Sequence, residues 1–157
     1  MTTVQPLKTP IAHERSAVWA MYIGLVLTVG ALIVPFVDHV ASNVLAHHVR
    51  AGYPDMSQAG MATAVTSYLV LLSIVGVVGI ACWTWTIWAT RRRVRWTTTI
   101  ATVLFVLGTC VSLADLLVKD GSGDTALPAL LGWVGMLPCL PGLIAVTLLW
   151  TGRRASP

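Results

Sequence analysis

Four long apolar runs, separated by polar segments, dominate the pattern of side chains along this sequence. They cover about residues 18–37, 64–89, 96–117 and 127–151, and none of them contains Lys, Arg, Glu or His. A helix needs about 20 apolar residues to cross the hydrocarbon core of a bilayer. The pattern therefore predicts an all-α protein, a bundle of four transmembrane helices in which Asp115 is the one charged side chain inside a span.

The connection at 38–63 is longer than most structureless loops in compact domains, so we expect it to have structure of its own. Apolar residues recur there on one helical face: Val37, Val40, Val44, Leu45 and Val49. The first helix is expected to continue past the membrane to Arg50, or to bend at Pro35 and lie along the outer surface. A new helix cap is expected at Asp55 or Ser57. These extensions would form a short helical cap outside the membrane.

Composition supports lipid as the main solvent of this chain. Apolar residues make up 56% and charged residues 10%, whereas a soluble domain carries about 25% charged residues. Residues 1–157 are long enough for a single domain. The first apolar run is too long for a signal-peptide core, so we expect it to be retained as a span after a polar tail at 1–16.

The net charge of +4 is distributed unevenly between the two sides of the predicted membrane. One side receives Lys8, Arg15, Arg91, Arg92, Arg93, Arg95, Arg153 and Arg154, and the other receives Arg50 and Lys119. The positive-inside rule then predicts that both termini are cytoplasmic, in a bacterial cytoplasmic membrane. This distribution explains the basic charge without nucleic acid, and it makes the lipid bilayer the expected partner.

Tryptophans are concentrated near the same predicted interface. The residues concerned are Trp19, Trp83, Trp85, Trp88, Trp96 and Trp150. An amphipathic indole is favourably placed at the boundary between lipid and water, so these residues are interpreted as interfacial anchors. A platform for ligand stacking is the alternative interpretation.

The outer connection also carries the residues with metal-binding chemistry. His39, Asn43 and His47 follow at i, i+4 and i+8, so a continuous helix would stack them on one face. Imidazoles four residues apart can hold a divalent metal, which makes His39 and His47 a candidate metal or pH-sensing pair. The alternative is that they are solvated side chains of an outer helix. Because no span carries a histidine, haem ligation from facing helices is not expected.

Two features inside the spans are candidates for function. Asp115 is interpreted either as an interfacial ion pair with Lys119 at i+4, or as a gating or proton-relay group near Asn43 and the outer histidines. Pro138 and Pro141 each remove a backbone donor, which predicts a kink or local unwinding of the fourth span. Such a break lines a substrate site in some transporters, and elsewhere it is filled by neighbouring side chains.

Small residues recur every four positions in the first span, at Ala20, Gly24 and Thr28. This spacing predicts close helix packing, against another span or a second subunit. The segments WTIWATRRRVRW and GDTALPALLGWVGMLPCLPGL, together with the order of spans, resemble small uncharacterised four-span integral membrane proteins of high-GC Gram-positive bacteria. The resemblance covers most of the chain and implies no activity.

The function expected from these observations is non-enzymatic. The chain shows no nucleophile with a base and no pair of carboxylates for a shared site, and the cysteines have neither redox nor zinc spacing. We expect no cofactor, and a role as an accessory or self-associating component with a homo-oligomeric or other membrane-protein partner. The alternative is a small oligomeric transporter or channel that uses the kinked fourth helix and Asp115.

Overall fold

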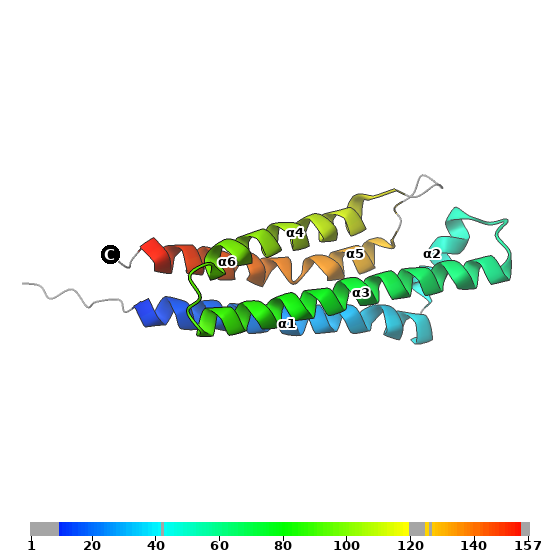
Figure 1. The fold of residues 1–157 in the computed structure, drawn as a ribbon. Helices are drawn as coiled ribbons and strands as arrows, with labels where there is room; N and C mark the ends of the chain where they lie inside the picture. Colours follow the sequence, from blue (N-terminus) through cyan, green and yellow to red (C-terminus); the bar gives the residue numbers. More distant parts are fainter. Residues whose placement is uncertain (1–9, 42, 120–124, 126, 155–157) are drawn as a thin grey trace, which may run out of the picture.

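The computed structural model describes residues 10–41, 43–119, 125 and 127–154, and its long helices run side by side (Figure 1). The helices are α1 (Pro10–Ala41), α2 (Val44–Gly52), α3 (Gln58–Arg91), α4 (Thr97–Leu117), α5 (Ala129–Met136) and α6 (Cys139–Arg154). Four segments are long and apolar enough to cross a membrane: Glu14–Ala41, Gln58–Arg91, Thr97–Leu117 and Ala129–Arg153. The predicted all-α bundle with four spans is confirmed. The tail up to residue 9 and the polar connection at 120–124 lie outside the described residues.

The helices pack in an order that differs from their order in the chain. α1 packs closely against both α3 and α6, and α4 packs against α5 and α6. The first turns of α1, the last turn of α6 and the α3–α4 connection lie at one end of the bundle, which we call the inner end (Figure 1). α2 lies at the opposite, outer end.

The α3–α4 connection is short, and it turns at Arg93 with a φ of 52°. So short a connection predicts a tight antiparallel hairpin, but α3 and α4 pack against each other far less than α1 packs against α3 or α6. Three interactions at this end join different segments: Arg93 Nη2 to Glu14 Oε2 at 3.0 Å, Arg91 over the Tyr22 ring, and Arg153 Nη2 donating to Arg95 O. Arg92 lies over the Trp88 ring of its own helix.

The outer end differs from the first of the two predicted arrangements, a continuous helix between Val18 and Arg50. α1 runs through Pro35 without interruption but ends at Ala41, and Asn43 adopts a left-handed conformation with a φ of 52°. The chain then reverses into α2. The Asp38 carboxylate accepts hydrogen bonds from the backbone N–H groups of Val44 and Leu45, both at 3.0 Å. These bonds satisfy free donors at the start of α2, so Asp38 stabilises the break.

Two groups of buried residues hold the bundle together. The outer group joins α2, α3 and α5 through Leu45, Val49, Val65, Leu127 and Leu131, and Leu45 is only 2% exposed. The inner group joins α1, α3 and α6 through Ala20, Met21, Ile87 and Ala145, and Met21 is 1% exposed. The expected helical cap is therefore present, and α3 begins at Gln58, after the predicted cap at Ser57, whose Oγ accepts from Gly60 N.

Candidate functional site

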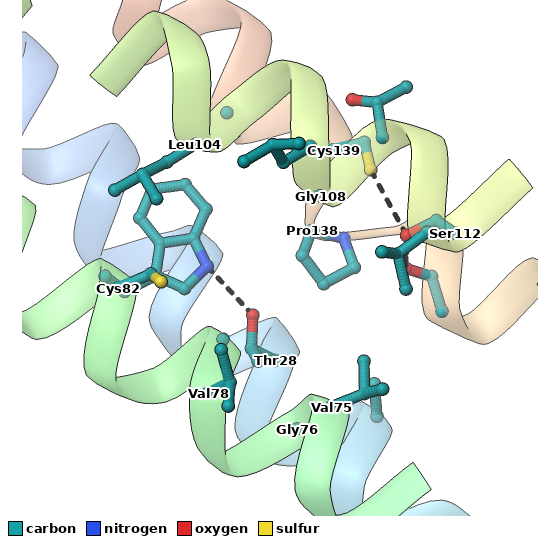
Figure 2. Close-up of a pocket in the computed structure, with 18 of the residues that line it drawn as sticks. Thr28, Val75, Gly76, Val78, Cys82, Leu104, Gly108, Ser112, Pro138 and Cys139 are labelled. Carbon is teal, nitrogen blue, oxygen red and sulfur yellow. Dashed lines mark hydrogen bonds between the residues drawn. The ribbon is translucent and has the colours of Figure 1, made fainter. Parts of the chain in front are cut away.

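A groove of about 430 Å³ runs along the bundle between α3 and α4 (Figure 2). α3 contributes one wall, from Leu72 to Thr86, and α4 contributes the other, from Ala101 to Asp115. Side chains of α1, α5 and α6 form the floor. The groove exists because the floor helices contact one another and α4, while α3 and α4 remain apart.

The groove opens on the side of the bundle that would face lipid. Ile74 and Val78 on α3, and Leu107 and Val111 on α4, line the groove and are also exposed at the surface. Ile74 and Leu107 are each 57% exposed. Side chains that are both lining and exposed mark the edges of an opening. In a membrane this opening would face the hydrocarbon, because all four of these edge residues are apolar.

Two glycines keep the groove open. A Cβ added at Gly108 on α4 or at Gly135 on α5 would have no neighbouring atom within 4 Å. Both residues line the groove, and Gly108 is labelled on α4 in Figure 2. A larger side chain at either position would therefore enter space that no other described group occupies.

The floor of the groove contains the break between α5 and α6, as the two prolines predicted. Pro138 cannot donate to Val134 O, and this carbonyl instead accepts from Leu137 N at 3.3 Å. Ser112 Oγ on α4 donates to Gly135 O at 3.2 Å and accepts from the Cys139 thiol at 3.7 Å (Figure 2). Ser112 thus joins α4 to the broken span. Sequence reasoning missed it, although a hydroxyl in an apolar run is a recognisable signal.

The inner part of the groove is closed by Trp83. Its Nε1 donates to Thr28 Oγ1 at 2.9 Å, and Thr28 Oγ1 donates to Gly24 O at 2.8 Å. A Cβ at Gly24 would overlap the Trp83 ring. Trp83 is therefore half-buried inside the bundle, which corrects its interpretation as an interfacial anchor. The face predicted at Ala20, Gly24 and Thr28 packs against other spans of the same chain.

Asp115 lies at the outer end of the groove, half-buried and one turn beyond Ser112. The predicted ion pair with Lys119 is not formed, since the structure records Arg93–Glu14 as the ion pair among its described residues. Lys119 lies beyond the end of α4 and is exposed. Its backbone forms an isolated antiparallel β-bridge with Thr125. No described residue forms a hydrogen bond with the Asp115 carboxylate. The groove is otherwise lined without Lys, Arg, His or Glu.

The histidine face predicted in the outer connection is not formed as one helix. His39 lies in α1 and His47 in α2, both exposed, and Asn43 occupies the reversal between them. Because the three residues do not belong to one continuous helix, the i, i+4, i+8 spacing does not place their side chains on a common face. Within the described ranges, no three His, Cys, Asp or Glu residues lie together as a metal site. His48 contacts another element, with Nε2 2.6 Å from Thr125 O.

The groove can bind an apolar molecule and place a polar group beside a carboxylate. Ser112 Oγ is hydrogen-bonded to Gly135 O and to the Cys139 thiol, and among the described residues it forms no hydrogen bond with Asp115. Comparisons of the chain with protein-family models, with curated proteins and with solved structures found no match.

Proposed function

We propose that this is a non-enzymatic, integral membrane protein that binds one amphiphilic molecule, taken from the surrounding bilayer, in the groove between α3 and α4. The observation that supports this function best is the apolar opening between Ile74 and Leu107. A molecule dissolved in the bilayer could enter there without crossing water. Binding sites for small molecules are concave, largely apolar and about 300–1,000 Å³ in volume, a range that includes this groove.

The size of the groove favours a small molecule over a helix of a partner protein. A helix about 10 Å wide that crosses a 30 Å core fills on the order of 2,000 Å³. The groove offers about 430 Å³. An accessory role through helix docking, or self-association through this face, would therefore place only part of the partner helix inside the groove.

A small oligomeric transporter is a second candidate, because Asp115 and the break at 138–141 lie along the same groove. Two observations favour binding over transport. The lining is predominantly apolar, and Gly135 O, one of the carbonyls at the break, is already occupied by Ser112. Carbonyls at a broken helix coordinate a solute only when they are free.

The orientation that we propose places both termini in the cytoplasm of a bacterium. Arg91, Arg92, Arg93 and Arg95 lie at the same end of the bundle as the last turn of α6 (Figure 1). Arg153 joins them through its hydrogen bond to Arg95 O. Because loops rich in Lys and Arg are usually cytoplasmic, the arginines at this end support the proposed orientation.

The binding function is tested by photo-crosslinking in phosphatidylcholine nanodiscs. A long-chain alcohol with a diazirine in its chain is expected to label α3, α4 and α6 within the groove more strongly than Val26 and Ile33, which are exposed on α1. Gly108→Trp should fill the groove and lower groove labelling about tenfold, which corresponds to about 1.4 kcal/mol.

Gly30→Trp is the matched control. Gly30 is exposed on α1, does not line the groove, and also has no atom within 4 Å of an added Cβ. This variant should leave groove labelling unchanged. Equal labelling of the groove and the outward face of α1, unaffected by Gly108→Trp, would contradict the proposed function.

A further inference from the structure

The groove changes in polarity along α4, from its inner to its outer end. The α4 residues that face it recur with helical spacing, and they include Ala101, Leu104, Gly108, Ser112 and Asp115. The first three are apolar, Ser112 carries a hydroxyl, and Asp115 carries a carboxylate. Along this face of α4 a bound molecule would therefore meet apolar groups over most of its length and a carboxylate at the outer end alone, although hydroxyls of Thr28, Thr86 and Thr109 also line the groove.

The dimensions of the groove suit one hydrocarbon chain. From Ala101 to Asp115 α4 rises about 21 Å, at 1.5 Å per residue. Spread over this length, the volume of 430 Å³ gives a mean cross-section on the order of 20 Å². This area is similar to the cross-section of a single hydrocarbon chain at van der Waals distance from the lining.

The charge at the outer end selects the polar group. A carboxylate within a membrane span is costly unless a cation or hydrogen-bond donors compensate it. The described lining of the groove supplies no cationic side chain, and Lys119 forms no ion pair with Asp115. A ligand that brings its own positive charge would supply this compensation.

Ser112 provides a second acceptor on the same face. It lies three residues before Asp115, so both side chains project from neighbouring turns of α4. Its Oγ donates to Gly135 O and accepts from Cys139, which leaves one acceptor position. An ammonium group has three N–H donors. It could donate to Asp115 and to Ser112 together, whereas a hydroxyl has one donor and no charge.

We infer that the ligand is a single-chain amphiphile with a protonated amine head group, held with its amine at Asp115 and Ser112 and its chain toward Ala101. This inference rests on the proposed function of the groove, and it adds the chemical class of the ligand. Asp115 is then the residue that determines specificity, while the apolar lining supplies general affinity for the chain.

The test compares two photoreactive probes in phosphatidylcholine nanodiscs at neutral pH. They have the same alkyl chain and diazirine, and one ends in a primary amine while the other ends in a hydroxyl. In the unmodified protein the amine probe is expected to label the groove about tenfold more strongly. Asp115→Asn should lower amine labelling to the level of the hydroxyl probe and leave hydroxyl labelling unchanged. Asp115→Glu should retain a preference for the amine.

Asp55→Asn is the charge-matched control, because Asp55 is exposed in the turn before α3 and does not line the groove. It should keep the tenfold preference. Equal labelling by both probes in the unmodified protein, or a preference that persists in Asp115→Asn, would overturn the assignment of the amine. In those cases a loss of both labels in Gly108→Trp would still support the binding groove, whereas absence of groove labelling by either probe overturns both proposals.

Discussion

The contact between α1 and α3 and the groove between α3 and α4 both contain glycines, with opposite results. On the α1–α3 contact, a Cβ at Gly24 would overlap Trp83, and one at Gly76 would lie 2.7 Å from Leu32 Cδ1. On α4 and α5, the groove-lining Gly108 and Gly135 have no neighbour within 4 Å. The same residue type therefore allows close packing at the α1–α3 contact and leaves open space in the groove.

The polar groups of the two regions differ in the same way. On the α1–α3 contact, Trp83, Thr28 and Gly24 O form a continuous chain of hydrogen bonds. At the outer end of the groove, no described residue binds the Asp115 carboxylate. Polar groups in lipid are normally satisfied within the protein. The comparison indicates that the α1–α3 contact holds the fold together, whereas the groove is available for a ligand.

The largest expected effect comes from placing the same side chain in both regions. Gly24→Leu should lower the free energy of unfolding by about 3 kcal/mol relative to Gly108→Leu, because overpacking displaces Trp83 at the first site alone. Both glycines lie inside helices, so the gain in helix propensity is similar in the two variants. Unfolding in mixed detergent and SDS micelles measures the difference.

Gly30→Leu is the control for this comparison, since it adds an equal side chain to the lipid-facing side of α1. Its stability should match that of Gly108→Leu. If Gly24→Leu and Gly108→Leu unfold at the same SDS fraction, the two regions do not differ in packing as the structure indicates.

A smaller loss of stability is expected at the outer end, where the Asp38 carboxylate caps the start of α2. Asp38→Ala removes the acceptor for Val44 N and Leu45 N, and should lower stability by about 1–2 kcal/mol, the usual effect of losing a helix cap. Amide hydrogen exchange should accelerate in α2. Asp55→Ala, which changes an exposed acid near the same end, should leave exchange in α2 unchanged, and equal acceleration in both variants would contradict a capping role.

Helices could be predicted from the sequence where a local pattern of residues determines their position. They could not be predicted where a contact with another helix determines it. The spans follow from apolar runs, and the Ser57 cap and the break near Pro138 follow from local chemistry. The end of α1 could not be predicted, because the Asp38 side chain acts on the start of a different helix. Periodicity at 37–49 continued across that reversal and therefore indicated one helix.

The groove could be predicted only in part. Asp115 and the proline pair were recognised as candidates, but an apolar run does not reveal which spans are neighbours. α1 and α6, which are far apart in the chain, pack closely, while α3 and α4 are adjacent in the chain and separate. Trp83 was placed at the interface for the same reason, since its Thr28 partner belongs to another span.

The smallest expected effect concerns the hydrogen bond that joins the α4 wall of the groove to its floor at α5. Ser112→Ala removes the donor to Gly135 O and should cost about 0.6 kcal/mol, the average for hydrogen bonds between membrane helices. Ser73→Ala is its control, because the Ser73 hydroxyl donates to Leu69 O within α3 and joins no second helix. Spin labels on α4 and α6 should show a wider distribution of distances in Ser112→Ala than in Ser73→Ala. Identical distributions would mean that packing of α4 against α5 and α6 positions this wall of the groove without the Ser112 hydrogen bond.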